Sequence, residues 1–292
     1  MSISRASATA LLNSVQRGLS PIELVYVPHP KWPLPRSQSL VPQRPLQISV
    51  LDSSFNPPTL AHLALANAPR PRVGSDVGGE YDAKIYLLSV RNADKTLKPT
   101  DASYIQRLEM MLCLAQDSVS SRDEHQVAIG IVDEPTFVGK ASKLLAFLAQ
   151  RLSGLGFAPP RPELTFLLGL DTLERVLAPR YYGASPADPD AEAKMFASLH
   201  TFFSPEHDNA RIVCARRASV SSSEAATLKI AERFVSEQRI ALIDIGEAEQ
   251  TYSSTAVRNA IGQGDDSSWK GLVSPSVREY ITGSMLYTNP VD

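Results

Sequence analysis

Residues 50–68, VLDSSFNPPTLAHLALANA, concentrate polar side chains between two apolar segments. An apolar run ends at Asp52, two prolines follow, and an apolar-periodic segment begins near Thr59. Proline disfavours helical geometry in the residue before it and threonine is a fair N-cap, so the pattern predicts strand, loop and helix. Helix N-termini attract anions through their free backbone N–H groups. We expect either a phosphate site that includes His62 or an ordinary capped turn.

A second polar helix start lies near the C-terminus, in residues 251–264, TYSSTAVRNAIGQG. Ser253, Ser254 and Thr255 are good helix-cap residues, and Arg258 follows one turn later. Hydroxyls, backbone N–H groups and a guanidinium that converge on one helix end can bind a phosphate chain. The alternative is capping alone, with Arg258 on a solvated face.

Short apolar runs and helix-compatible stretches alternate along the rest of the chain. The predicted strands are 46–52, 83–90, 126–133, 164–170, 210–215 and 239–245, and the predicted helices include 104–116, 141–152, 172–177 and 224–236. Runs rich in Val, Ile and Leu are typical of strands buried on both faces. The alternation predicts an α/β fold with a doubly wound parallel sheet, which binds ligands at the carboxyl ends of its strands.

Residues 1–45 differ from this pattern, so we divide the chain into an N-terminal helix and proline-rich extension, 1–45, and a main domain, 46–292. In residues 1–22, one face of a helix that packs on the domain could be lined by Leu11, Leu12, Val15 and Leu19, although two arginines and no acids also fit a mitochondrial transit peptide. The prolines of residues 27–45 predict an extended strap or linker. Residues 183–210 form an insertion that interrupts the alternation of strands and helices, and the spacing of His200 and His207 within it matches no zinc site.

Composition excludes several functional classes. The net charge of -2 gives no general attraction to nucleic acid, and no apolar run reaches the ~20 residues that span a bilayer. Cys113 and Cys214 are the two cysteines of the 292 residues, and their spacing suggests neither a disulfide framework nor a zinc site. A reducing compartment, cytoplasm or nucleus, is therefore favoured over the mitochondrion.

Two motifs resemble those of the nucleotidyltransferase superfamily. SSFNPPTLAH resembles its (H/T)xGH region, and YSSTAVR resembles its ISSTxxR motif. The chain is similar to nicotinamide mononucleotide adenylyltransferases, particularly their divergent fungal relatives, over most of residues 46–287. Four further segments match in order, namely KTLKPTDASYIQRLEMM, LLGLDTLERVLAPRYY, RIVCARR and GLVSPSVREYITGSMLY. The resemblance implies the Rossmann-like nucleotidyltransferase fold.

The resemblance also implies a reaction, the transfer of the adenylyl group of ATP to nicotinamide mononucleotide, which gives NAD and pyrophosphate. The phosphate nucleophile is already anionic, so positioning and charge neutralisation suffice without a general base. Mg²⁺ would be carried mainly by the ATP phosphates, with no dedicated protein ligand set. Relatives range from monomers to larger assemblies, so a homo-oligomer is compatible with the resemblance.

The positions that match the family motifs imply roles for individual residues. The catalytic residues would be His62, Thr59 and Arg258. The predicted ATP-binding residues are Ser53, Ser54, Phe55, Asn56, His62, Gly169, Asp171, Ser253, Ser254, Thr255 and Arg258. The predicted mononucleotide-binding residues are Lys95, Asp171, Tyr182 and Arg216.

The sequence departs from the family pattern at several points. Ser53 and Ala61 stand where the family has glycine, and Tyr252 replaces an apolar residue. The tryptophans that stack the nicotinamide ring in relatives have no counterpart, so Tyr182 or Phe137 would supply a stacking face. The family pattern therefore specifies ATP as a substrate more closely than it specifies the acceptor. The alternatives are another acceptor, an ATP hydrolase, and a nucleotide-binding regulatory protein on the same fold.

Overall fold

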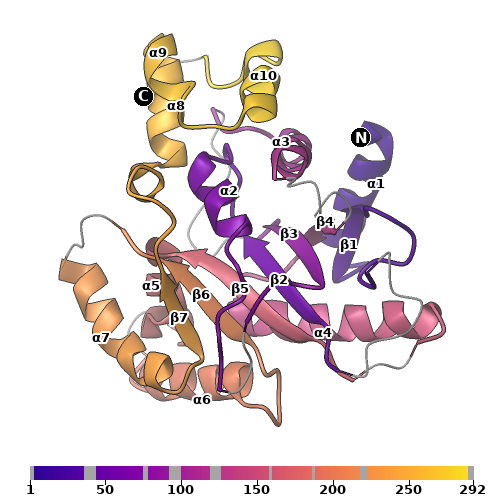
Figure 1. Cartoon of the computed structure of the whole chain (residues 1–292), viewed down its shortest axis with the longest axis vertical. Helices are drawn as coiled ribbons and strands as arrows, with labels where there is room; N and C mark the ends of the chain where they lie inside the picture. The colour runs from indigo at the N-terminus through magenta and orange to yellow at the C-terminus, as the bar shows by residue number, and fades with distance from the viewer. Residues whose placement is uncertain are drawn as a thin grey trace.

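A seven-stranded sheet forms the centre of the molecule in the computed structural model, which describes residues 3–35, 44–74, 78–91, 100–118, 126–157, 160–185, 188–217 and 222–288 (Figure 1). Its strands are β1 (Ile22–Tyr26), β2 (Gln47–Asp52), β3 (Ala83–Ser89), β4 (Val127–Val132), β5 (Glu163–Gly169), β6 (Arg211–Ala215) and β7 (Ile240–Ile243). Their spatial order is β1-β4-β3-β2-β5-β6-β7.

Strands β2 to β7 are all parallel to their neighbours, and β1 alone runs antiparallel, beside β4. The chain moves outward from β2 through β3 to β4, then returns to β5 on the other side of β2 and moves outward to β7. The prediction of a doubly wound parallel sheet is confirmed, together with all six predicted strands. The order reverses between β2 and β5, and ligands of such sheets bind beside this reversal, at the carboxyl ends.

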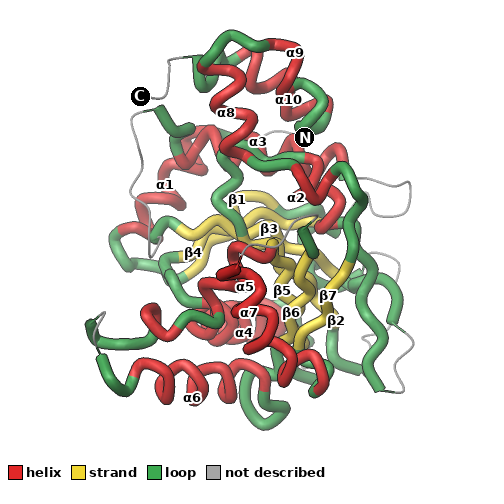
Figure 2. Tube along the Cα trace, turned by 90° about the vertical axis from the view of Figure 1, so that its left-hand side faces the viewer, coloured by secondary structure: helices red, strands yellow, loops and turns green. Residues whose placement is uncertain are grey.

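Helices cover both faces of the sheet (Figures 1 and 2). One face packs against α4 (Phe137–Gly154), α5 (Leu170–Val176), α6 (Ala191–Phe203) and α7 (Ser222–Ser236). The other packs against α1 (Arg5–Gln16), α2 (Leu60–Ala66), α3 (Tyr104–Asp117), α8 (Ser254–Gly262), α9 (Asp266–Trp269) and α10 (Pro275–Gly283). Two short 3₁₀ helices, η1 (Pro179–Tyr181) and η2 (Glu249–Thr251), complete the described elements. Apolar residues fill both faces of the central strands because both are covered.

The N-terminal segment contributes to the sheet itself. Strand β1, which the sequence analysis missed, pairs with β4 through residues such as Ile22 and Val132. The predicted helix is present as α1, and Leu12 and Val15 on it are buried against the sheet. In the proline-rich part, Trp32 is fully buried and its Nε1 donates a hydrogen bond to the carbonyl of Gln126 at 3.0 Å. A strand of the main sheet thus comes from the segment expected to be an extension.

Residues 183–210 are also more ordered than the sequence suggested. Residues 191–203 of this segment form α6, whose residues Met195, Leu199 and Phe202 are buried in the core beside α4. The sequence analysis assigned no helix here, although one face of the segment carries apolar residues at helical spacing.

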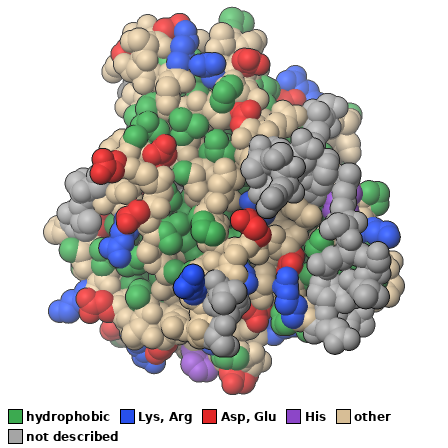
Figure 3. All heavy atoms as spheres, viewed as in Figure 1, with side chains coloured by type: hydrophobic (Ala, Val, Ile, Leu, Met, Phe, Trp, Pro, Cys, Tyr) green, Lys and Arg blue, Asp and Glu red, His purple; other side chains and the backbone are tan. Residues whose placement is uncertain are grey.

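The surface carries no dominant charge on the face seen in Figure 3, where basic and acidic side chains are interspersed. This distribution agrees with the net charge of -2. Among the described residues, none of the helices is both long enough and apolar enough to cross a bilayer.

If the N-terminal segment is part of the domain core, Trp32→Ala should lower the free energy of unfolding by about 3–5 kcal/mol, the usual cost of truncating a buried aromatic residue. Urea unfolding followed by circular dichroism would measure the change. Leu19→Ala is the matched control, since the Leu19 side chain is 76% exposed. A Trp32→Ala protein as stable as the control would contradict this role.

Candidate active site

The loop between β2 and α2 is fastened to the core by Phe55. Its side chain is fully buried, with ring centroids 6.2 Å from Tyr86 and 5.8 Å from His62. The backbone of Phe55 has a φ of 46°, in the left-handed region that non-glycine residues seldom adopt. The turn that buries Phe55 leaves Ser53 and Ser54 at the carboxyl end of β2, where they line cavities.

Hydrogen bonds fix the orientation of the His62 ring. Its Nδ1 accepts from the backbone N–H of Thr59 at 3.1 Å and lies 2.9 Å from the Thr59 hydroxyl oxygen. Its Nε2 lies 2.9 Å from the Ser53 hydroxyl oxygen. A backbone N–H can only donate, so Nδ1 must carry a lone pair and the neutral ring holds its proton on Nε2. His62 therefore presents a hydrogen-bond donor toward Ser53.

Burial lowers the pKa of His62 to about 4, against a smaller upward effect of the Asp171 carboxylate. The ring is therefore neutral at physiological pH. A neutral donor in this position can stabilise charge that develops on a nearby phosphoryl oxygen without an imidazolium.

The start of α8 faces this loop. Ser253 caps α8 by accepting a hydrogen bond from the N–H of Ala256 at 3.1 Å. Ser254 donates its hydroxyl proton to the carbonyl of Pro57 at 2.7 Å. Residues about 200 positions apart are thus held together across the carboxyl edge of the sheet.

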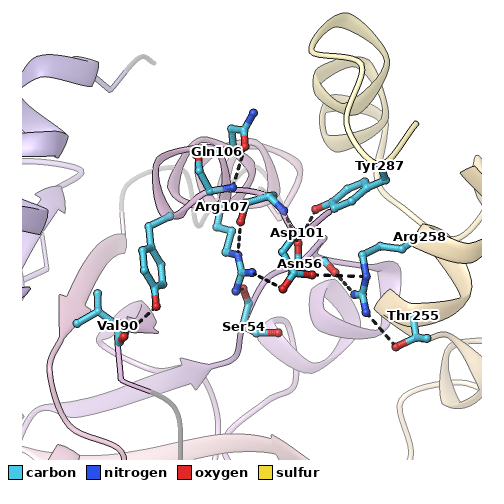
Figure 4. A network of polar contacts seen from close by, with 12 residues as sticks. Ser54, Asn56, Val90, Asp101, Gln106, Arg107, Thr255, Arg258 and Tyr287 are labelled. Carbon is cyan, nitrogen blue, oxygen red and sulfur yellow. Dashed lines mark hydrogen bonds and ion pairs between the residues drawn. The ribbon is translucent and has the colours of Figure 1, made fainter. Parts of the chain in front are cut away.

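A polar network supports the loop from the side of α3 and the C-terminal segment (Figure 4). The Asn56 side chain donates to Asp101 at 2.6 Å and accepts from the Tyr287 hydroxyl at 2.8 Å. Arg258 donates to the backbone carbonyl of Asn56. Arg107 is buried and donates to the carbonyls of Ser54 and Ala102, and burial lowers its pKa. The network places Arg258 at the edge of the loop and fixes the backbone of residues 54–56.

Two cavities open beside each other on this edge. The α8 cavity has a volume of about 250 Å³ and is lined by the loop after β2, α2, the ends of β5 and β6, and α8. The α4 cavity has a volume of about 270 Å³ and is lined by the same loop, the end of β3, the start of α4, and α5 with η1. Both cavities are lined by Asp52, Ser53, Ser54, Asp171 and Thr172. The two cavities therefore share a wall at the reversal of strand order.

Most of the sequence-predicted site residues line these cavities. The α8 cavity holds Ser53, Ser54, His62, Gly169, Asp171, Arg216, Ser253, Ser254, Thr255 and Arg258. The α4 cavity holds Asp171 and Tyr182, together with Phe137. Arg216 was predicted with the mononucleotide group, yet it lies with the residues predicted for ATP. The end of β6 places it there, because β6 lies on the far side of β5 from the α4 cavity.

Three predicted residues line neither cavity. Phe55 belongs to the core, Asn56 to the polar network, and Thr59, which is fully buried, to the hydrogen bonds of His62. Their side chains position the loop rather than face a ligand. Lys95 lies outside the described residues.

The structure adds residues that the sequence analysis did not single out. Asp52 and Lys140 form an ion pair of 2.5 Å in the wall of the α4 cavity, and Arg217 lines the α8 cavity 3.4 Å from Asp171. Each follows or ends a parallel strand, or begins the helix after one. The rule that such ends form the site could have found Asp52 and Arg217. Lys140 lay one residue before the predicted helix, and its orientation depends on where α4 begins.

The strand order and the paired cavities place a ligand site at the carboxyl ends of the strands, and the two motifs that line it resemble those of nucleotidyltransferases. No family model matches the sequence. A candidate nicotinamide mononucleotide adenylyltransferase of Schizosaccharomyces pombe is 29% identical over 246 residues, 80% of this chain and 83% of that protein. Over most of its length the chain is thus similar to a protein of the nicotinamide mononucleotide adenylyltransferase family.

Solved structures of Plasmodium falciparum nicotinic acid mononucleotide adenylyltransferase are also similar. The complex with NaAD has a TM-score of 0.48 and 15% identity, and the complex with APC has 0.46 and 13%. Each match covers 85% of this chain and 100% of that one.

The lowered pKa of His62 predicts a pH dependence of stability. Between pH 6.5 and 4 the unfolded chain binds a proton that the folded protein does not, so stability falls as the pH falls through this window. His62→Gln removes this effect. Relative to that variant, the wild type should lose up to about 1.4 kcal/mol of unfolding free energy per pH unit below 6. Urea unfolding of both proteins at pH 7 and pH 5 measures it, and a constant difference would contradict the pKa.

Proposed function

We propose that the protein transfers the adenylyl group of ATP to the 5′-phosphate of a nicotinamide-type mononucleotide. The observation that carries this proposal is the shared wall of the two cavities. A two-substrate reaction needs two ligands whose reacting phosphates meet, and three residues with hydroxyl groups line both cavities, namely Ser53, Ser54 and Thr172. ATP would occupy the α8 cavity and the mononucleotide the α4 cavity.

The reaction requires little covalent help from the protein. A phosphate oxygen of the mononucleotide attacks the α-phosphorus of ATP, the bond from that phosphorus to the β-phosphate bridging oxygen breaks, and pyrophosphate leaves with that electron pair. Both reactants are anionic, so the main tasks are alignment and charge neutralisation. These tasks suit a site built from hydroxyls, guanidinium groups and a neutral histidine.

His62 would donate from Nε2 to an oxygen of the α-phosphate, in place of its contact with Ser53. Arg258 would hold the β- and γ-phosphates, together with the hydroxyls of Ser254 and Thr255. Thr59 acts through His62, because its N–H and hydroxyl hold Nδ1. Thr59 is thus proposed as a positioning residue.

Mg²⁺ would enter with ATP, held mainly by the phosphate oxygens, because it keeps several of its waters and takes few protein ligands in such sites. It supplies charge neutralisation on the triphosphate. Within the described ranges, no group of three or more His, Cys, Asp or Glu side chains could hold a metal ion. Asp171 and Asp52 are the carboxylates that line both cavities, and Asp52 is paired with Lys140.

A product assay tests the proposal. With ATP, Mg²⁺ and nicotinamide mononucleotide, we expect a dinucleotide and pyrophosphate in equal amounts. ADP and inorganic phosphate without dinucleotide would instead identify an ATP hydrolase, and ATP binding with neither product set would identify a regulatory nucleotide-binding protein. Chromatography of the nucleotides with a coupled pyrophosphate measurement separates the three outcomes.

Variants of His62 and Arg258 should distinguish an effect on the catalytic rate from an effect on ATP affinity. His62→Ala should lower kcat by ~10²–10³ with nearly unchanged ATP affinity, since its donor acts mainly on transition-state charge. Arg258→Ala should weaken ATP binding by roughly 10- to 150-fold, the equivalent of one charge-assisted hydrogen bond of about 1.5–3 kcal/mol. Arg258→Lys should recover only part of this loss, because an ammonium lacks the planar fork.

Calorimetry with ATP beside steady-state kinetics on the three variants makes the comparison. Arg233→Ala is a matched control, since Arg233 lies on the exposed side of α7 in a surface ion pair with Glu237. An Arg258→Ala protein that binds ATP as tightly as the control would remove Arg258 from the triphosphate site.

A further inference from the structure

The ion pair of Asp52 and Lys140 is unusual because both charged side chains are buried. Asp52 is the last residue of β2, and Lys140 lies in the first turn of α4. Their side chains are 7% and 5% exposed, and Oδ2 and Nζ are 2.5 Å apart. Removing two charges from water is costly, and apolar residues of similar size often serve stability equally well. Stability alone therefore does not account for this pair.

The pair has hydrogen-bonding capacity left over toward the α4 cavity. Nζ of Lys140 carries three protons; the described structure gives it one hydrogen bond, to Asp52, and places it 4.6 Å from the centroid of the Phe137 ring. The described hydrogen bonds of the Asp52 side chain involve only Oδ2. Both residues line the α4 cavity, so its wall presents a cationic donor directly beside an anionic acceptor.

Aromatic side chains line the same cavity. Phe137, Tyr181 and Tyr182 offer faces and edges against which a planar ring can pack. Such a ring would bring its substituent toward polar groups in the wall.

We propose that Asp52 and Lys140 select the acceptor by the substituent on its pyridine ring, and favour the carboxamide over the carboxylate. This inference rests on the proposed function. A carboxamide has an oxygen that accepts from Lys140 and an NH₂ that donates to Asp52, so it matches the donor and acceptor of the pair. A carboxylate can only accept, and it would place a second negative charge against Asp52, whose side chain is buried.

The selection works by exclusion as much as by attraction. A site that hydrogen-bonds a substituent discriminates strongly against an analogue that leaves its buried polar groups unpaired or opposed. Lys140 alone would favour the acid. Asp52 supplies the repulsive element that reverses this preference.

Competing kinetics with nicotinamide mononucleotide and nicotinic acid mononucleotide test the inference. The wild type should show a kcat/KM for the amide at least about tenfold above that for the acid, the effect of one hydrogen bond to a charged group. Asp52→Asn removes the repulsion and keeps the Lys140 cation, so the ratio should fall by about tenfold or more. The double variant Asp52→Asn with Lys140→Met leaves no buried charge, and its ratio should approach one.

Asp82→Asn is the matched control, because Asp82 is also a buried carboxylate in an ion pair, with Arg44 at 2.7 Å, but it lies at the amino end of β3. Its amide-to-acid ratio should equal that of the wild type. Calorimetry with each mononucleotide gives a second readout that does not depend on turnover, and circular dichroism confirms that each variant is folded.

The outcomes are distinguishable. A wild type that prefers the acid, or a ratio that Asp52→Asn leaves unchanged, overturns this inference while the adenylyl transfer stands. ATP hydrolysis without dinucleotide overturns the proposed function, and the two calorimetric affinities then still decide whether the pair discriminates. Binding of neither mononucleotide overturns both.

Discussion

The site depends on how the seven residues after β2 are held. Phe55 is buried in the core, the Asn56 side chain is bonded to Asp101 and Tyr287, and the Pro57 carbonyl accepts from Ser254. These contacts come from different parts of the chain, so the loop is constrained from several sides. A rigid loop can keep two ligands aligned without the cost of ordering it on binding. The constrained loop fixes the positions of the Ser53 and Ser54 hydroxyls and of the His62 ring.

The same constraint explains the division of labour among the loop residues. The side chains of Phe55 and Asn56 hold the backbone, while Ser53 and Ser54 line both cavities. His62 reaches the α8 cavity through the first turn of α2. The Ser53 hydroxyl has a partner in this position, the Nε2 of His62.

The sequence was sufficient to predict the strands of the sheet, because the central strands are apolar on both faces. This pattern can be recognised without reference to distant residues. The sequence was insufficient to predict β1, because the segment IELVY forms an edge strand that is only half-buried and lies close to several prolines. It located His62, Ser254 and Arg258 through their motifs. It could not show that Asn56 turns away from the ligand, because the side-chain direction depends on Asp101 and Tyr287, which are distant in sequence.

Lys140 illustrates the same limit for charge. A lysine near a helix start is ordinarily solvated, and only the arrangement of α4 beside β2 buries it against Asp52. Tertiary packing thus created a polar site that neither composition nor local spacing encodes.

Strand β1 has a consequence for the way the molecule is made. It is synthesised about 100 residues before its partner β4, so during elongation it has no strand beside which to lie. Once formed, it covers the edge of β4, which would otherwise present a row of unpaired backbone groups to other chains. The N-terminal segment therefore completes this side of the sheet only after β4 has been synthesised.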